Sequence, residues 1–242
     1  MVSLADVMAI APTLATAEFR VQATLNLYDA PTCIGLATQA ATGRQLRILS
    51  SQPDPAGALS VVLCEDDYPG WLAIGDLAAL KPAPEPYRAI ALSYSKICRR
   101  LPEVIAFAQA AMAQPNHYLW GGTVGPNYDC SGLMQTAFAA SGIWLPRDAY
   151  QQEAFLQPVT QADLQPGDLV FFGTPERCTH VGLWVGDRHY LHSSGKDQGR
   201  NGIGLDVLAA EGDRISQSYF QQFRGAGRVR QCYMPKAGAR GV

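Results

Sequence analysis

The first third of the chain alternates between short apolar runs and clusters of turn residues. Four of the apolar runs have the length and composition of strands: residues 19–28, 44–49, 59–64 and 71–74. Proline, glycine and aspartate gather between these runs, for example in Tyr68-Pro69-Gly70. Short strands at this spacing, separated by turns, predict a small all-β barrel within residues 1–83.

Prolines at alternate positions separate this region from the rest of the chain. Pro82, Pro84 and Pro86 each fix φ and lack an N–H donor, so the segment should be extended, without a helix or a sheet ladder. We therefore predict a proline-rich linker at residues 84–99 and a second domain at residues 100–242.

The second domain begins with helical spacing and ends with strands. Pro102 suits a first helical position, and apolar residues follow it at helical spacing. A second helix is predicted to begin near Cys130 and to end near Gly142, a residue that suits a C-terminal cap. Three apolar runs then have the length of strands: residues 169–172, 180–185 and 190–193. Helices followed by an antiparallel sheet predict an α+β architecture.

Composition narrows the class of protein. The chain has 242 residues, which allows one large domain or two modest ones at a prior of roughly 150 residues per domain. Hydrophobic residues make up 48% and charged residues 17%, which is typical of a globular protein rather than a disordered one. The formal net charge of −2 offers no basic surface for nucleic acid or an anionic membrane. No apolar run reaches the length of about 18 residues that a membrane span requires.

The cysteines and the N-terminus indicate a compartment. Six cysteines are scattered without a CxxC pair, which favours a reducing environment. The apolar run at residues 7–11 ends at Pro12, and Asp6 stands where a signal peptide carries positive charge. Although Ala15-Thr16-Ala17 resembles a cleavage site, we therefore expect no signal peptide and a cytoplasmic protein.

Cys130 is the strongest candidate for a reactive group. It follows a glycine-rich loop and stands in the first turn of a predicted helix, flanked by Asp129 and Ser131. Free N–H groups and the positive end of the helix dipole stabilise an anion there, and such sites lower a thiol pKa from about 8.5 to roughly 3.5–7.5. A buried packing role is the alternative, but two polar neighbours argue against it.

A nucleophilic cysteine needs a base, and three of the four histidines, His180, His189 and His192, lie in one predicted strand pair. If the turn between the strands holds an odd number of residues, His192 falls opposite Gly182, and His180 and His192 share one face. An even number would point the two rings to opposite faces. On a shared face, one imidazole could take the thiol proton while the other orients it.

Metal binding is the competing interpretation of these residues. Cys178, His180, His189 and His192 form a loose Cys-x-His and His-x-x-His set that resembles zinc-ligand spacing. Residues three apart in a strand point to opposite faces, so His189 and His192 do not converge easily on one ion. We therefore expect no metal site, and we expect His189 and His117 to be solvated or to pack in the protein.

A series of motifs resembles those of the NlpC-type cell-wall cysteine peptidases, in matching order and spacing along most of residues 100–232. These motifs are Tyr118-Leu119-Trp120-Gly121-Gly122, Tyr128-Asp129-Cys130-Ser131-Gly132-Leu133, Gly167-Asp168-Leu169-Val170-Phe171-Phe172, Thr179-His180-Val181-Gly182-Leu183-Trp184 and Tyr190-Leu191-His192-Ser193. The resemblance implies a papain-like fold, in which a helix that begins with the cysteine packs on an antiparallel sheet that carries both histidines.

The resemblance also implies roles for individual residues. Cys130 would be the nucleophile, His180 the general base and His192 the orienting residue. The Tyr118 hydroxyl would help the Cys130 N–H to stabilise the oxyanion, unless Tyr118 only packs in the core. Asp129 and Ser131 would contact the free N-terminal amine of the substrate, a role that helix capping by Asp129 does not exclude.

The first domain resembles the bacterial SH3-like domains that accompany these peptidases. The segment Tyr68-Pro69-Gly70-Trp71-Leu72, with Asp76 after it, matches the part that closes one end of the catalytic groove in two-domain members. The resemblance implies substrate contacts for Tyr68 and Asp76. Tyr68 could instead be a turn residue beside a core tryptophan. The neighbouring acidic residues 65–67 are typical of a solvated turn.

The function implied by the resemblance is specific. It is hydrolysis of the γ-D-glutamyl to diamino acid bond in peptidoglycan stem peptides that begin with a free L-Ala, such as L-Ala-γ-D-Glu-diaminopimelate, with no cofactor. A cytoplasmic location would favour the recycling of cell-wall fragments. A related thiol amidase or acyltransferase would share the Cys–His pair. A non-enzymatic module that binds wall peptides would tolerate the loss of Cys130 or His180, and both are present.

Overall fold

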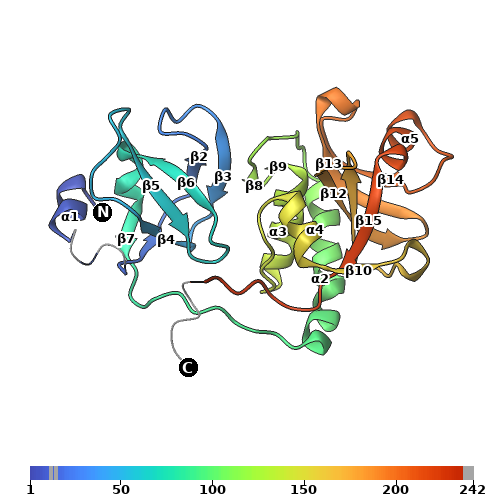
Figure 1. Ribbon diagram of the computed structural model, residues 1–242, viewed down its shortest axis with the longest axis horizontal. Helices are drawn as coiled ribbons and strands as arrows, with labels where there is room; N and C mark the ends of the chain where they lie inside the picture. Colours follow the sequence, from blue (N-terminus) through green and yellow to red (C-terminus); the bar gives the residue numbers. More distant parts are fainter. Residues whose placement is uncertain (11–12, 14–15, 237–242) are drawn as a thin grey trace. The chain divides into compact units, whose positions relative to one another are not determined.

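The computed structural model describes residues 1–10, 13 and 16–236, which form two compact units. The first unit comprises Met1–Ile90, together with Trp120–Val124 and the C-terminal segment that begins at Met234. The second comprises Ala91–Leu119 and Gly125–Tyr233. Figure 1 shows the elements of both units along the chain. The described residues include no helix that is long and apolar enough to cross a bilayer.

The N-terminal residues form a short helix, α1 (Leu4–Ala9), whose capping box joins Ser3 and Asp6. The apolar run at residues 7–11 continues beyond this helix. The last residue of this run, Ala11, lies outside the described residues, as does Pro12, which ends the run. Ala15, the first residue of the cleavage-like motif, lies outside them too.

Antiparallel strands build the first unit. The strands are β1 (Phe19–Val21), β2 (Leu25–Tyr28), β3 (Leu36–Ala40), β4 (Gln45–Ile48), β5 (Ala58–Leu63), β6 (Pro69–Ala73) and β7 (Leu80–Pro82). The 3-10 helix η2 (Ile74–Ala79) connects β6 to β7. The seven strands pair in the order β3-β2-β6-β5-β4-β1-β7. Apolar side chains such as Leu27, Leu46 and Val61 alternate inward and form one core. Among the described residues, the end strands β3 and β7 do not pair with each other, so the strand pairing does not close the expected barrel.

Two local predictions in this unit were wrong. Residues 19–28 form two strands, because the pairing changes: β1 pairs with β4 and β7, and β2 with β3 and β6. The alternate prolines also do not exclude a ladder, since Pro82 pairs with Phe19 in β7. A proline is tolerated there because β7 is an edge strand, on which a missing N–H breaks no required bond.

Of the acidic residues after β5, Glu65 and Asp66 are buried and Asp67 is partly exposed, which corrects the expectation of a solvated turn. Glu65 accepts a hydrogen bond from the Arg44 side chain at 3.1 Å and one from the Gln45 backbone at 2.7 Å. Asp66 pairs with the same guanidinium at 2.9 Å. The carboxylates therefore hold the buried Arg44 in place immediately before β4.

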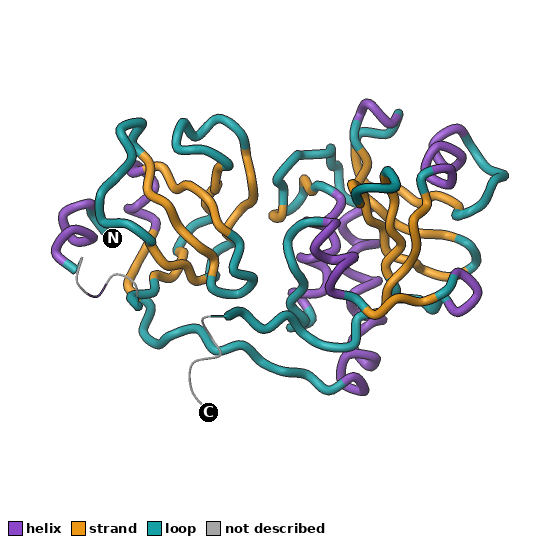
Figure 2. Tube along the Cα trace, viewed as in Figure 1, coloured by secondary structure: helices purple, strands orange, loops and turns teal. Residues whose placement is uncertain are grey.

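The second unit has helices on both faces of a six-stranded antiparallel sheet (Figures 1 and 2). Its helices are α2 (Tyr94–Met112), α3 (Cys130–Ala140), α4 (Ala149–Phe155) and α5 (Arg214–Gln221), with the 3-10 turns η3 (Gln161–Asp163) and η4 (Lys196–Gln198). The sheet order is β10 (Gln157–Val159), β15 (Phe223–Arg228), β11 (Leu169–Gly173), β12 (Cys178–Gly186), β13 (His189–Ser194) and β14 (Gly202–Val207). The short strand β8 (Thr123–Val124) groups with the first unit, and β9 (Asn127–Tyr128) with the second. The predicted α+β architecture is confirmed.

The two faces of this sheet have different cores. Leu183 and Leu191 point to the face that α2, α3 and α4 cover. Trp184 and Tyr190, their neighbours along the strands, point to the other face, where they pack with Tyr219 of α5. Strand alternation therefore decides which side chains meet which helices.

The first helix of this unit begins earlier than the sequence predicts. Pro102 lies inside α2, which begins at Tyr94, within the stretch expected as linker. A proline in a helix interior costs about 3 kcal/mol. Ile97, Val104 and Ala108 nevertheless continue one buried face through it, and this packing holds the helix together.

Candidate active site

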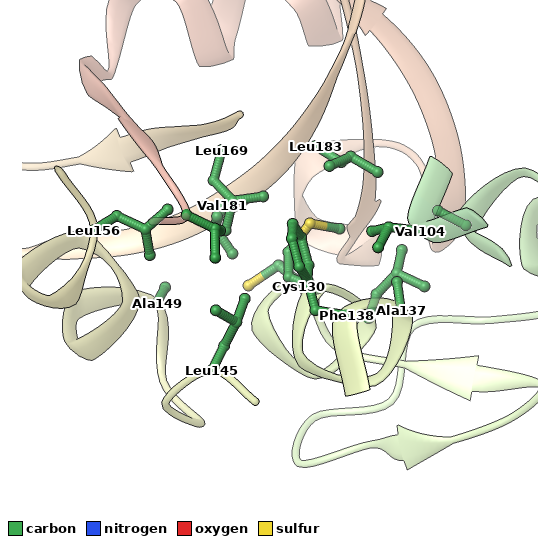
Figure 3. Packing of buried hydrophobic residues seen from close by; sticks show 14 of the residues in the cluster. Val104, Cys130, Ala137, Phe138, Leu145, Ala149, Leu156, Leu169, Val181 and Leu183 are labelled. Carbon is green, nitrogen blue, oxygen red and sulfur yellow. The ribbon is translucent and has the colours of Figure 1, made fainter. Parts of the chain in front are cut away.

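Cys130 is the first residue of α3, as the sequence predicts. Asp129 caps the helix, and its side chain accepts a hydrogen bond from the Gly132 N–H at 2.6 Å. The Cys130 side chain is only 5% exposed and lies near Val181 of strand β12 (Figure 3). Its sulfur accepts hydrogen bonds from the backbone N–H groups of Val181 and Ser131. The cysteine is thus fixed between a helix N-terminus and the middle of the sheet.

The thiol pKa is raised, which corrects the expectation of a lowered value. Burial and the charge of Asp129 raise the pKa of Cys130 to about 12, although two N–H donors and Arg147 act in the opposite direction. Loss of hydration therefore outweighs the helix N-terminus at this position. In the free protein the sulfur is a thiol, and it needs a base to become a nucleophile.

The two candidate histidines share one face of the sheet. Leu183 pairs with Leu191 and Trp184 with Tyr190, so the register places His192 beside Gly182. A bulge between Trp184 and Gly186 gives the connection its odd number of residues. The distance between His180 Nε2 and His192 Nδ1 is 2.6 Å. Of the two registers that the sequence allows, the folded chain has the one that joins the rings.

The two ring nitrogens of His180 have different surroundings. Its Nε2 atom is engaged by His192, and its ring packs against Tyr219 and Phe172. Among the described residues, no hydrogen bond joins the His180 ring to the Cys130 thiol. Val181, the residue after His180, donates its backbone N–H to the Cys130 sulfur. Within the described residues, Nδ1 is the ring nitrogen of His180 that makes no hydrogen bond.

The other members of the loose zinc-like set lie apart. Cys178 belongs to the core beneath α3, and its thiol donates to the His180 carbonyl at 3.3 Å. His189 is partly exposed and contacts the Asp187 carbonyl at 2.6 Å. Within the described ranges, no three His, Cys, Asp or Glu side chains are placed to hold a metal ion.

Burial controls the charge of both histidines. Desolvation lowers the pKa of His180 well below its ordinary value, and the neighbouring His192 lowers it further. Desolvation also lowers the pKa of His192, although Asp206 opposes this effect through a hydrogen bond and its charge. Both rings are therefore neutral at neutral pH.

Acidification is expected to destabilise the protein through these two rings. Below an unfolded-state pKa of about 6.5, the unfolded chain binds protons that the buried imidazoles do not, so the free energy of unfolding falls as the pH drops. Each ring contributes at most about 1.4 kcal/mol per pH unit. Urea denaturation at several pH values below about 7.5 measures this slope. His192→Gln should reduce this slope, and an unchanged slope in that variant would contradict the expectation.

Tyr118 and Ser131 lie close to Cys130. Burial raises the pKa of the half-buried Tyr118 hydroxyl, and the nearby Cys130 and Asp129 raise it further. Ser131 is buried, and its hydroxyl contacts Asp129 Oδ1 at 3.3 Å. Both side chains thus lie near the cysteine, and their expected roles toward the oxyanion and the substrate amine are proposals.

Tyr68 and Asp76 belong to the first unit. Tyr68 precedes β6, is half-buried against the core of the sheet, and its N–H donates to Asp66 Oδ1 at 3.2 Å. Asp76 lies in the first turn of η2; burial raises the pKa of Cys33, and the charge of Asp76 raises it further. Their expected substrate contacts remain a proposal.

Sequence reasoning missed an arginine that supports Asp129. Arg147 is 1% exposed, and its guanidinium meets the carboxylate at two points: Nη2 to Oδ2 at 2.6 Å and Nη1 to Oδ1 at 3.1 Å. Nη1 also donates to Ser131 Oγ at 3.0 Å. The only local signal is a lone arginine after the apolar residues Ile143 and Leu145.

Two further residues around the histidines were missed. The Tyr219 ring of α5 lies 4.5 Å from the His180 ring and 4.9 Å from the His192 ring. Asp206 of β14 contacts His192 Nε2 at 2.6 Å. Neither residue belongs to a motif or to an element that the sequence analysis predicts.

Comparison with known proteins finds a family match in each of the two units. Residues 115–224 match the NlpC/P60 family, and residues 27–77 match the bacterial dipeptidyl-peptidase SH3 domain. A γ-D-glutamyl-L-lysine dipeptidyl-peptidase of Bacillus subtilis is 46% identical over 119 residues, which are 48% of this chain and 36% of the relative. A probable endopeptidase p60 of Listeria seeligeri is 36% identical over 126 residues, 52% of this chain and 22% of the relative.

A solved structure of an NlpC/P60 family protein from Bacillus cereus aligns with a TM-score of 0.48 and 21% identity, over 92% of this chain and 66% of the other. The chain spans well under half the length of the two curated relatives. The two family matches confirm the resemblance that the sequence motifs indicate. Residues 115–224 are therefore similar to the NlpC/P60 family, and residues 27–77 are similar to the bacterial dipeptidyl-peptidase SH3 domain.

Proposed function

We propose that the chain is a cysteine peptidase with Cys130 as nucleophile, His180 as general base and His192 as the residue that orients His180. The observation that carries this proposal is the placement of Cys130 at a helix start, against β12, together with the 2.6 Å contact between the histidines of β12 and β13. The match of residues 115–224 to the NlpC/P60 family supports it.

The proposed reaction is acyl transfer through the sulfur. His180 Nδ1 takes the thiol proton as the sulfur attacks the carbonyl carbon, and the Cys130 N–H and Tyr118 hydroxyl stabilise the oxyanion. The imidazolium then gives its proton to the leaving amine, and a thioester remains. Water attacks the thioester with His180 as base, which releases the carboxylate and restores the thiol. No cofactor takes part.

The proposed substrate is a peptidoglycan stem peptide, L-Ala-γ-D-Glu-diaminopimelate, cleaved after the γ-D-glutamyl residue. The name of the Bacillus subtilis relative supports a γ-D-glutamyl bond. Asp129, Ser131, Tyr68 and Asp76 would select a peptide whose N-terminal L-Ala amine is free. Because all six cysteines carry free thiols, we also propose a reducing cytoplasm as the location and the recycling of wall fragments as the role.

Incubation with the free tripeptide and with its N-acetylated form tests this proposal, with products identified by mass spectrometry. The free peptide should release L-Ala-D-Glu, and acetylation should lower kcat/KM by about 10- to 100-fold, the value of one charge-assisted contact. Failure to release L-Ala-D-Glu would overturn the substrate. Equal cleavage of the two peptides would overturn selection of the free amine.

A further inference from the structure

Asp206 is a buried carboxylate on the face of the sheet that carries both histidines. It lies in β14 opposite Tyr190, and Gly204 lies opposite His192. Residues two apart share a face, so Asp206 is a diagonal neighbour of His192. Its residue exposure is only 2%, which is unusual for an aspartate unless it is paired.

The Asp206 carboxylate ends a continuous chain of hydrogen bonds. Its Oδ2 atom lies 2.6 Å from His192 Nε2, and His192 Nδ1 lies 2.6 Å from His180 Nε2. The other oxygen, Oδ1, accepts from the Arg200 guanidinium and, at 3.4 Å, from the Ser216 hydroxyl. The ion pair with Arg200 keeps Asp206 ionised and thus an acceptor only.

Glycines on the two strands beside β13 leave space for this chain of hydrogen bonds. A Cβ atom on Gly182 of β12 would lie 2.6 Å from the Tyr190 ring and 3.3 Å from His192 Cβ. A Cβ atom on Gly204 of β14 would lie within 2.7 Å of three atoms of the Arg200 guanidinium. Because Gly182 and Gly204 carry no side chain, the Tyr190 ring, His192 and Arg200 occupy the space beside them.

An acceptor at one end of the chain fixes every proton along it. Because ionised Asp206 can only accept, His192 must carry its proton on Nε2, and its Nδ1 is then an acceptor. His180 must donate from Nε2, so its remaining nitrogen, Nδ1, bears the lone pair. That nitrogen is the one left to take a proton from Cys130.

We propose that Asp206 is a positioning residue that fixes the tautomers of His192 and His180 and so keeps His180 Nδ1 ready to accept the thiol proton. The catalytic consequence rests on the proposed cysteine-peptidase function, whereas the tautomers themselves do not. An amide in place of the carboxylate can donate to His192 Nε2, and this would reverse both hydrogen bonds and leave the proton on His180 Nδ1.

The tautomers can be read without any substrate. Long-range ¹H–¹⁵N spectra of the ¹⁵N-labelled full chain at about pH 7.5, where both rings are neutral, should show Nε2–H for His180 and for His192. Asp206→Asn should shift one or both rings toward Nδ1–H, and Asp213→Asn, which keeps the N-cap of α5, should change neither. An Nδ1–H tautomer at His192 in the unmodified protein would overturn the proposal, even if Asp206→Asn failed to fold.

Kinetics of the same variants connect the tautomers with catalysis. We expect Asp206→Asn to lower kcat for the stem tripeptide by about 10- to 100-fold with KM within about twofold, and Asp213→Asn to match the unmodified protein. Unchanged kcat in a folded Asp206→Asn would overturn the positioning role. If the unmodified protein shows the expected tautomers but cleaves no peptide, the proposed function fails and the tautomer assignment stands.

Discussion

Replacing Cys130 with alanine is expected to lower kcat/KM for the stem tripeptide by at least about 1,000-fold, because the reaction would lose its covalent intermediate. Serine should not restore the rate. A hydroxyl in this buried position is a weaker nucleophile than a thiol, and neutral His180 is the only proposed base. Initial rates from product analysis by mass spectrometry measure the loss.

Cys232→Ala is the matched control. Cys232 is also buried, belongs to the same core as Cys130, and its thiol makes only a 3.9 Å contact with the Gly142 carbonyl. Its removal should leave kcat/KM within about threefold of the starting value, since it takes no part in the proposed chemistry. Full activity in Cys130→Ala, or a comparable loss in Cys232→Ala, would refute the assignment of the nucleophile.

The largest effect on stability is expected at Arg147. Arg147→Met fills a similar volume but leaves the Asp129 carboxylate buried without the guanidinium that grips both its oxygens. Breaking such a pair from one side costs about 3–5 kcal/mol. Urea denaturation should show this loss as a lower midpoint with little change in the m-value.

An exposed ion pair provides the comparison. Arg188 pairs with Glu211 at 2.9 Å, but their side chains are 61% and 82% exposed. Arg188→Met should therefore change the free energy of unfolding by less than about 1 kcal/mol. A loss below about 1 kcal/mol for Arg147→Met would show that the buried pair is not a main support of the Cys130 helix.

Local sequence signals predicted the elements whose stabilising contacts are local. The start of α3 depends on Asp129 and its end on Gly142, two residues that adjoin the helix itself, and both ends were predicted. The predicted start of α2 was wrong because Pro102 suits the first position of a helix. The first turns of α2 depend instead on the packing of Ile97 against residues far along the chain. The face shared by His180 and His192 depended on a bulge that no local pattern reveals.

The parts of the site that escaped prediction depend on contacts between distant residues. Alternation along β14 would favour burial of Leu205 and exposure of Asp206, yet Leu205 is 44% exposed and Asp206 is buried. The reversal reflects partners on other segments, His192 and Arg200, that offset the cost of burying the carboxylate. Arg147 likewise gains its role only when its loop folds back on α3.

The bulge before Gly186 also bears on which genetic changes this protein can tolerate. The tight turn at Asp187 and Arg188, both with positive φ, joins β12 to β13 and holds the count of residues between His180 and His192. A one-codon insertion or deletion there would turn one histidine to the opposite face of the sheet, even with every side chain of the site retained. In the lineage of this domain, the length of that short connection should be under stronger selection than the identity of its exposed residues.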